Sequence, residues 1–233
     1  MSEKRFSVKL VALTQPSIQI PENDEIRALT PDEFVAYTAR VSNPTNQANT
    51  LTMPKLVKYL KDHAHWSPFE MCSAVLEVET SRAIAAQILR HRSFSFQEFS
   101  QRYQESTSAG YVEYDIRRQD LKNRQNSIDD LPKEWEEEFR QDQKEIWDLA
   151  SSKYQKWIDR SGAKECARFL LPLNTKTKLY IAGTLRSWIH YVAVRTEDGV
   201  QLEHKEIAVA CRDLLAKELP SIFEVPAGDS DND

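Results

Sequence analysis

Two hydrophobic spacings recur along the chain, and together they predict both strands and helices. Apolar residues fall on every second position in residues 6–14, 73–80 and 177–185, a spacing that is typical of half-buried strands. In the first strand, the residues expected on the buried face are Phe6, Val8, Leu10 and Ala12. These three segments supply the sheet of the predicted fold.

Apolar positions three and four residues apart predict the helices. They are expected over residues 31–41, 52–63, 81–92, 132–161, 163–171, 188–196 and 200–219, and the fourth is one long helix or two joined ones. Residues 30–33 form a capping box, Ser187 suits the start of the sixth helix, and Pro172 ends the fifth. The inner face of the last helix is expected to carry Leu202, Ile207, Ala210, Leu214 and Leu215.

Strands and helices are mixed here without a regular β-α alternation, which favours an α+β fold over a doubly wound sheet. We predict a single compact domain over residues 1–225, with a central sheet flanked by helices and one long helical segment. Residues 104–131 are polar and irregular between these elements. The acidic tail, residues 226–233, is expected to be disordered.

Composition narrows the function classes further. The net charge of −5 argues against bulk attraction to nucleic acid or to a membrane, and no apolar run approaches the roughly 18 residues of a membrane span. The three scattered cysteines, Cys72, Cys166 and Cys211, fit a reducing compartment, so we expect a cytoplasmic protein. With only five glycines and no glycine-rich phosphate loop, any nucleotide must be held by side chains and helix ends.

The stretch RHRSFSFQEFSQRY, residues 90–103, mixes cations, hydrogen-bonding groups and aromatic rings. Cations at its start could simply be those favoured at a helix C-terminus. The continuation points instead to a nucleotide, because a guanidinium suits phosphate and base carbonyl edges while short polar groups complete the contacts. The phenylalanines either stack on a ring or pin the loop to the core, and the second is favoured.

Three other polar groups have simpler alternatives. His63 and His65 follow a helix end without a third ligand nearby, so a metal site is disfavoured. Arg168 could pair locally with Glu165, three residues before it. Arg195 could be a cation favoured at a helix C-terminus. However, it follows the nearly apolar run WIHYVAV, and an arginine that emerges from a buried helix needs an anionic or carbonyl partner.

These motifs together resemble the flavin-dependent thymidylate synthases. The resemblance rests on Arg90-His91-Arg92 followed after seven residues by Ser100 and Arg102. Further blocks match in the same order: ARVS at 39–42, HWSPFE at 65–70, ECARFLLPLN at 165–174, LRSWIHYVAVR at 185–195 and, more weakly, QLE at 201–203. The matching region runs from about residue 34 to residue 215.

The resemblance implies that dUMP is converted to dTMP, with methylenetetrahydrofolate as carbon donor and with FAD as hydride carrier recharged by NADPH. It implies a homotetramer with FAD between subunits, which would need no glycine-rich loop. The implied dUMP contacts are Gln87, Arg90, Glu98, Phe99, Ser100, Gln101, Arg102, Arg168 and Arg195. The implied FAD contacts are Ser42, His65, Ser67, Arg90, His91, Arg92, Glu98, Thr184, Arg186 and His190.

The spacing of Gln87 and Arg90 predicts that both lie on one face of a helix. The chain departs from the family's commonest pattern at Thr184 and His190, where asparagine occurs in other members, and at Trp66, where an acidic residue is frequent.

The chemistry follows from the weakness of uracil C5 as a nucleophile. Negative charge must develop toward O4 or N3 before C5 attacks a methylene carbon, and a fixed cation at that edge would stabilise it. We assign this catalytic role to Arg195. No cysteine has a sequence neighbour that marks an activated thiolate, so no covalent enzyme intermediate is predicted. Ser100 lacks an evident base and lies beside arginines, which favours ligand binding over a nucleophilic role.

Two other classes stay open from the sequence. The chain could be a flavin- or nucleotide-binding module without synthase turnover, because binding residues do not prove catalysis. It could also be an RNA-binding protein that uses the Arg/Phe-rich segment for stacking and phosphate contacts, although the acidic net charge counts against this. We therefore predict an enzyme that acts on small-molecule substrates and binds neither nucleic acid, membrane nor metal.

Overall fold

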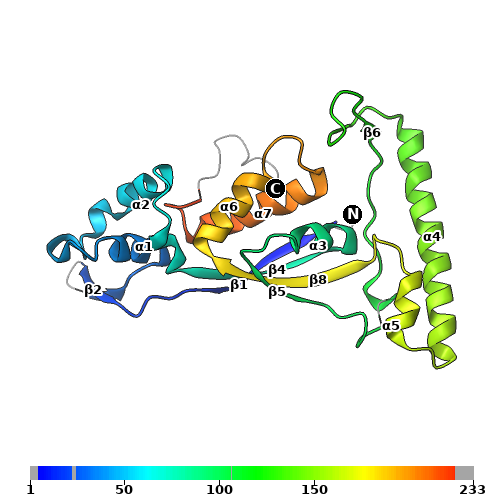
Figure 1. Cartoon of the computed structure of the whole chain (residues 1–233), viewed down its shortest axis with the longest axis horizontal. Coiled ribbons are helices and arrows are strands. Elements are labelled where there is room, and N and C mark those ends of the chain that lie inside the picture. Colours follow the sequence, from blue (N-terminus) through cyan, green and yellow to red (C-terminus); the bar gives the residue numbers. More distant parts are fainter. Residues whose placement is uncertain (1–4, 23–24, 106, 224–233) are drawn as a thin grey trace.

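A four-stranded antiparallel sheet forms the centre of the computed structural model, which describes residues 5–22, 25–105 and 107–223. The strands lie in the order β1 (Ser7–Leu13), β4 (Ser73–Ser81), β8 (Lys176–Thr184) and β5 (Ser95–Glu98). Helices α3 (Arg82–Ile88), α6 (Leu185–Arg195) and α7 (Leu202–Glu218) cover its apolar face (Figure 1). The predicted α+β class is confirmed.

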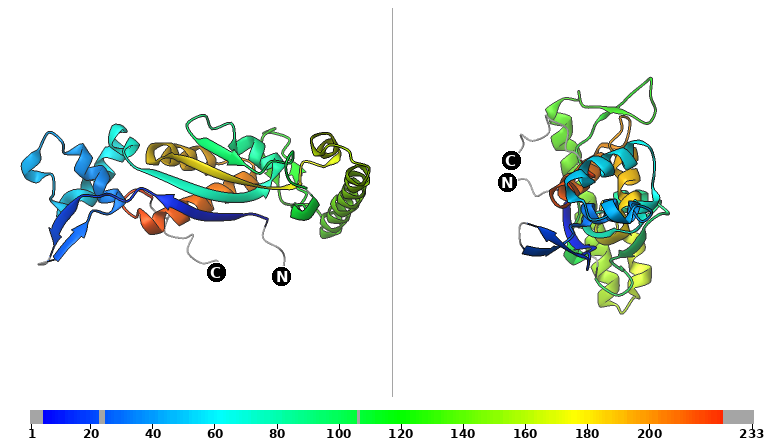
Figure 2. Two further views of the ribbon diagram at one scale, coloured as in Figure 1. Left: turned by 90° about the horizontal axis from the view of Figure 1, so that it is seen from below. Right: turned by 90° about the vertical axis from the view of Figure 1, so that its left-hand side faces the viewer.

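The molecule is elongated, with helices beyond both ends of the sheet (Figure 1). Helices α1 (Pro31–Ala39) and α2 (Met53–Asp62) and the hairpin of β2 (Gln19–Glu22) and β3 (Glu25–Ala28) lie at one end. The 27-residue helix α4 (Lys133–Asp159) stands at the other end with α5 (Lys164–Ala167), and Figure 2 shows both ends from below. The long segment is therefore one helix and not two.

The described part of residues 104–131, which was expected to be irregular, contains only short regular elements. These are the 3-10 turn η4 (Thr107–Ala109) and the hairpin of β6 (Arg118–Gln119) and β7 (Ser127–Ile128). Other short turns are η1 (Pro44–Asn46), η2 (Thr50–Thr52), η3 (Ser67–Glu70) and η5 (Arg168–Leu170). In the described part of the chain, no helix is long and apolar enough to cross a membrane. The predicted disorder of the tail concerns residues outside the described ones.

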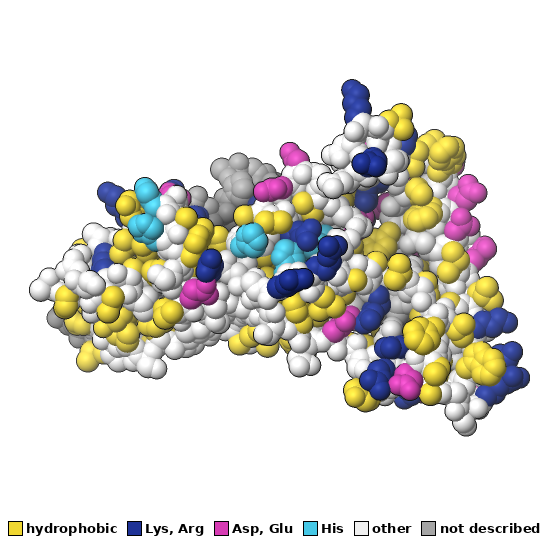
Figure 3. All heavy atoms as spheres, viewed as in Figure 1, with side chains coloured by type: hydrophobic (Ala, Val, Ile, Leu, Met, Phe, Trp, Pro, Cys, Tyr) yellow, Lys and Arg dark blue, Asp and Glu magenta, His cyan; other side chains and the backbone are white. Residues whose placement is uncertain are grey.

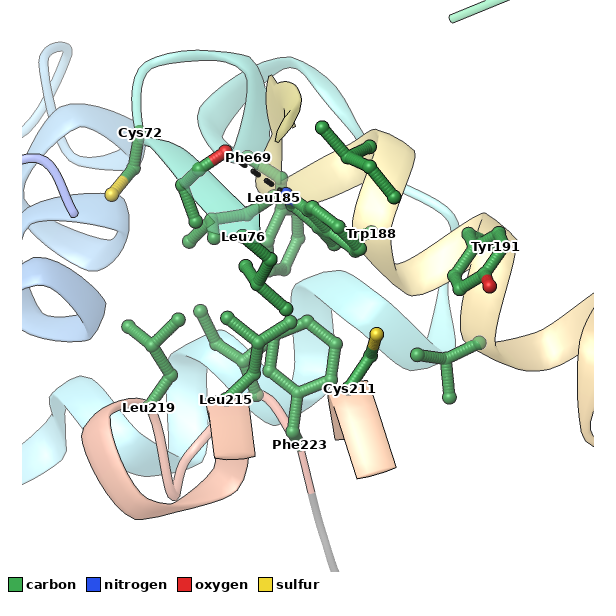
Figure 4. Close-up of a cluster of buried hydrophobic side chains, with 14 of the residues drawn as sticks. Phe69, Cys72, Leu76, Leu185, Trp188, Tyr191, Cys211, Leu215, Leu219 and Phe223 are labelled. Atoms are coloured by element: carbon green, nitrogen blue, oxygen red, sulfur yellow. Dashed lines mark hydrogen bonds between the residues drawn. The ribbon is translucent and has the colours of Figure 1, made fainter. Parts of the chain in front are cut away.

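The core lies between the sheet and the α6–α7 pair. Trp188 and Leu215 are fully buried there, and the Trp188 indole N–H donates to the Ala74 carbonyl oxygen at 3.2 Å (Figure 4). The opposite face of the sheet is polar, with Lys9 and Lys178 around Glu77. One covered face and one solvated face explain the period-two pattern of the strands.

The sequence predicted the start of α1 correctly, but it misplaced the start of α6. The Thr30 capping box is present, with both of its hydrogen bonds. The N-cap of α6 is Thr184 rather than Ser187, because the Thr184 hydroxyl accepts from the Ser187 N–H, so the helix begins three residues early. The short helix predicted at 163–171 is a single α-turn, α5, followed by the 3-10 turn η5.

Two predicted inner faces are corrected. In β1 the register against β4 shifts between Leu10 and Ala12, so Ala12 is exposed and Leu13 packs against the core. In α7, Leu202 is 39% exposed, and the fully buried positions include Ala208 and Cys211. A β-bulge depends on the pairing with the partner strand, so the apolar spacing of a single strand cannot predict its position.

Candidate functional site

The segment from Arg90 to Arg92 forms a turn between α3 and β5. The helix ends at Ile88, and the His91 N–H donates to the Ile88 carbonyl oxygen at 3.0 Å. Gln87 therefore lies in the helix and Arg90 beyond it, so the prediction that both share one helix face is wrong. Figure 3 shows basic and histidine side chains gathered on this face of the molecule, around α3 and α6.

Phe94 holds this turn to the core. Its ring is 8% exposed and lies 4.6 Å from the Trp188 ring and 5.9 Å from the Tyr191 ring, measured between centroids. A Cβ at Gly183 would collide with the Phe94 ring, so glycine in β8 leaves the space that this anchor fills. Phe96 also packs against the core. The favoured alternative for these two phenylalanines, loop anchoring, fits the structure.

Arg195, the last residue of α6, contacts His91. Its Nε donates to His91 Nε2 at 2.8 Å, so the imidazole accepts through Nε2 and is neutral. Burial, followed by the electrostatic effect of the nearby Arg195 and His190, lowers the pKa of His91 to about 4. The contact orients the guanidinium without neutralising its charge. Among the residues that the structure describes, Arg195 makes no other side-chain hydrogen bond.

A polar chain that the sequence reading missed runs behind Gln87. Gln87 Nε2 donates to Gln201 Oε1 at 2.5 Å, and Gln87 Oε1 lies 3.2 Å from Nδ1 of the fully buried His204. His204 Nε2 lies 3.2 Å from the Tyr191 hydroxyl. A signal was present in the sequence, because His204 falls on the same helical stripe as Ile207 in α7, where a purely structural core would carry an apolar residue.

A pocket of about 620 Å³ opens at the start of α6. It brings together three of the residues implied in FAD binding, Thr184, Arg186 and His190, with Trp66 and Ser93 also in its wall. Arg186 pairs there with Glu70 at 2.8 Å, and hydrogen bonds from Arg186 and Thr184 lower the pKa of Glu70. The donors of this pocket, a guanidinium, an imidazole and hydroxyls, suit the phosphates and polar edges of a flavin nucleotide.

A second groove, of about 730 Å³, lies beside the first. Its wall contains His65 and Ser67, while Ser42 follows the groove residue Val41 and is exposed. The turn η3 separates the two hollows, since Ser67 lines the second and Glu70 the first. The residues implied in FAD binding therefore surround η3 on both sides instead of lining one pocket. Arg90 and Arg92 lie apart from both walls, with exposed side chains.

The other implied dUMP residues gather around α5. Arg102 Nε donates to a Glu165 carboxylate oxygen at 3.1 Å, while Arg168 Nε donates to the Glu165 backbone carbonyl at 3.2 Å. The local Arg168–Glu165 pair considered from the sequence is thus replaced by a pair between Glu165 and Arg102. Ser100 Oγ accepts from the Arg102 N–H at 3.4 Å, and the Gln101 side chain is buried.

Glu98 lies in β5 between the two groups. Its carboxylate accepts from Arg82 at 2.6 Å and from the Thr177 hydroxyl at 3.0 Å. Phe99 continues the strand, and its N–H donates to the Lys178 carbonyl oxygen at 2.8 Å. Both residues therefore already have partners inside the chain.

The thiols offer no activated nucleophile. Cys72 and Cys211 are buried, and burial raises the pKa of each thiol. Cys166 is exposed on α5. Among the residues that the structure describes, no group of three or more potential metal ligands occurs. The His63 ring stacks on Tyr59, and its centroid lies 6.3 Å from that of His65.

Fold and site together define a protein with two cationic clusters and two hollows on either side of η3, on an α+β sheet. Residues 26–221 match the family described as thymidylate synthase complementing protein. The chain is 46% identical over 217 residues to a probable flavin-dependent thymidylate synthase of Paramecium bursaria Chlorella virus 1, and likewise to a flavin-dependent thymidylate synthase of Synechocystis sp.. Each match covers 93% of this chain and 97% of the relative.

The fold is similar to that of a UMP/dUMP methylase from Streptomyces cacaoi bound with 5-Br dUMP. The TM-score is 0.78 at 24% identity, covering 95% of this chain and 94% of that one. The chain belongs to the flavin-dependent thymidylate synthase family. It is an enzyme that methylates dUMP to dTMP and depends on FAD.

Proposed function

We propose that this enzyme uses methylenetetrahydrofolate as carbon donor and NADPH as reductant, and that Arg195 is its catalytic cation. The observation that carries the proposal is the geometry of α6. Its first half places Arg186 and His190 in the pocket, and its end holds Arg195 against a neutral imidazole. One helix thus links the proposed flavin site to the proposed catalytic arginine.

Arg195 would act on the charge that develops at the uracil edge. When C5 attacks the methylene carbon, negative charge grows toward O4 or N3, and a cation held in place beforehand stabilises it without reorganisation. The His91 contact supplies this preorganisation, because the Nε–H is already used and the terminal N–H groups keep a defined direction. No thiol is needed for this step.

FAD, when bound, supplies the hydride that completes the methyl group. Thr184, Arg186 and His190 would hold it from α6, and Ser42, His65 and Ser67 from the other side of η3. Arg90, His91, Arg92 and Glu98 are proposed as further contacts. The Thr184 hydroxyl already caps α6, which leaves it fewer free directions for a cofactor contact.

We also propose that the site is completed between subunits of a homotetramer. Gln87, Arg90 and Arg195 gather near α3 and α6, whereas Ser100, Gln101, Arg102 and Arg168 gather around α5. Exposed apolar side chains beside the second group favour an interface there. They are Trp135, Ile146, Leu149 and Trp157 of α4, each 48–62% exposed, and Phe169, 81% exposed.

A matched pair of variants tests the assembly. Leu149→Lys places a charge in the exposed apolar stripe of α4, and Gln155→Lys adds the same charge on another side of that helix. We expect smaller species and weaker FAD retention for L149K by light scattering and absorbance, with Q155K like the parent. A parent protein that is already monomeric would contradict the tetramer.

An omission assay tests the reaction. Purified enzyme is supplied with FAD, NADPH, dUMP and methylenetetrahydrofolate, and each is left out in turn. We expect dTMP only when NADPH, dUMP and methylenetetrahydrofolate are all present, and we expect added FAD to be required only by enzyme from which the flavin has been removed. A yellow protein that oxidises NADPH without forming dTMP would contradict the proposed co-substrate set.

A further inference from the structure

The ion pair of Arg117 and Glu203 begins a chain of hydrogen bonds that has only one possible direction. Arg117 donates to Glu203 at 2.6 Å, and the two side chains are 13% and 7% exposed. Burial alone would raise the pKa of Glu203, but hydrogen bonds from Arg117 and Gln201 outweigh it and lower the pKa. Glu203 is therefore a carboxylate, which accepts hydrogen bonds and cannot donate.

Because Glu203 can only accept, it determines the orientation of the two side-chain amides that follow, those of Gln201 and Gln87. Gln201 must turn its NH2 group toward the carboxylate, and the 2.9 Å contact of Gln201 Nε2 with Glu203 Oε2 shows this arrangement. Gln201 Oε1 then faces Gln87 and can only accept, so Gln87 must present its own NH2 group, at 2.5 Å. Gln87 Oε1 is left facing His204 at 3.2 Å.

The direction continues through the buried histidine. Because Gln87 Oε1 accepts, His204 Nδ1 must carry the proton, and Nε2 must then accept from the Tyr191 hydroxyl. His204 is completely buried, and burial together with the charge of Arg195 lowers its pKa to about 3, which agrees with a neutral ring. In His204, Nδ1 is therefore the donor and Nε2 the acceptor.

The chain ends beneath the proposed catalytic cation. The Tyr191 ring lies 5.0 Å from the His91 ring in an edge-to-face arrangement, and His91 accepts from Arg195. Earlier in the chain, the Gln87 amide uses one N–H for Gln201 and one oxygen lone pair for His204, which leaves its second N–H and second lone pair for a ligand. Without His204 and Glu203, that amide could turn by 180° and exchange its donor for its acceptor.

We propose that His204 is a positioning residue that, together with Glu203, holds the Gln87 amide in one orientation toward dUMP. The proposal rests on the proposed role of Gln87 in dUMP binding. His204 itself touches no substrate, because it is fully buried. Its effect on the reaction passes through the side chain of Gln87.

Three substitutions separate positioning from packing. His204→Asn can keep a donor near Nδ1 for Gln87, His204→Gln can keep an acceptor near Nε2 for Tyr191, and His204→Phe keeps volume but neither contact. We expect H204F and H204Q to raise the KM for dUMP about tenfold, the loss of roughly one oriented hydrogen bond, and to lower kcat less. H204N should have a KM for dUMP close to that of the wild type.

An equal KM for all three variants, or a KM ranked by thermal stability alone, would overturn the proposal. The wild-type protein provides a second test that requires no destabilising change. Nitrogen-15 NMR of labelled histidine should show His204 protonated at Nδ1, with its signal assigned by loss in H204N. Protonation at Nε2 would overturn the directional chain.

Glu203→Gln should reverse the direction of the hydrogen-bond chain. A glutamine at this position can accept from Arg117 and donate to Gln201, which lets both amides turn and moves the His204 proton to Nε2. We expect this change in tautomer and a raised KM for dUMP. An unchanged tautomer would overturn the proposal. The NMR readout is independent of turnover, so failure of the chain is distinguishable from failure of the proposed reaction, which would appear as absent dTMP in the wild type.

Discussion

Arg195 and Arg102 are both proposed to hold dUMP, but their surroundings are opposite. Arg195 donates to a neutral imidazole whose ring is packed against Tyr191, above a buried polar chain. Arg102 pairs with Glu165, and the two side chains are 55% and 53% exposed. The first arginine is held by neutral groups near the core and the second by a carboxylate at the surface.

The difference suits two tasks. A cation held by neutral partners keeps its full charge and direction, which is what stabilisation of a developing charge requires. An exposed ion pair contributes only about 0–1 kcal/mol, so a phosphate can displace Glu165 from Arg102 at little cost. We therefore expect the α6 region to control the rate and the α5 region to control affinity.

Removal of Arg195 should have the largest effect. Arg195→Ala is expected to lower kcat by about 10²–10³-fold while FAD remains bound, because one preorganised stabilising group is lost. Turnover and the flavin absorbance spectrum would be measured on the same sample. Near-normal kcat in this variant would remove Arg195 from the catalytic role.

Arg102→Ala should act on affinity. The loss of a charge-assisted contact to phosphate is expected to raise the KM for dUMP about 10–100-fold, with a smaller effect on kcat. Glu165→Gln serves as the matched control, since it removes the competing carboxylate and should not raise this KM. A loss confined to kcat in R102A would contradict the division between the two regions.

Acid should destabilise the α6 region through its two neutral histidines. The pKa values of His91 and His204 are lowered to about 4 and about 3, below the ordinary 6.5, so the unfolded chain binds protons that the folded chain does not. The free energy of unfolding should therefore fall as the pH decreases from about 6.5 toward 4. Urea unfolding of H204N should show a shallower fall than the wild type, and an equally steep fall would contradict the account.

Ser100→Ala should have the smallest effect. If Ser100 only donates to or accepts from dUMP, the KM rises a few-fold and kcat changes little, since one neutral hydrogen bond contributes about 1 kcal/mol. Loss of turnover with dUMP affinity intact would instead make Ser100 a nucleophile.

Local spacing was enough to predict the three long strands, because alternate positions of β4 and β8 face one apolar core. The same spacing could not reveal that α3 ends at Ile88, because Arg90 and His91 lie in a turn whose anchor, Phe94, packs beside Gly183 in a distant strand. The site residues came from motif resemblance, and the geometry now divides them into two regions.

The buried polar chain could not be predicted from local pattern. Its contacts join Gln87 to His204 and Arg117 to Glu203, pairs separated by 117 and 86 residues. Only the unusual histidine on the buried stripe of α7 was visible in the sequence. Likewise, the sequence misplaced the N-cap of α6, because both Thr184 and Ser187 are residue types that can cap a helix. In the structure β8 ends at Thr184, so the helix begins directly after it.

Mixed oligomers test the central claim, that the two regions meet between subunits. R195A and R102A would be co-expressed with different tags, and the hetero-oligomers isolated by tandem purification. The rate is measured with dUMP well below the wild-type KM, where both parent variants are slow. Because some sites then combine an intact α6 region with an intact α5 region from another subunit, dTMP formation should recover to about a quarter of the wild-type rate. Activity no higher than that of either parent variant would show that both regions serve a site within one chain.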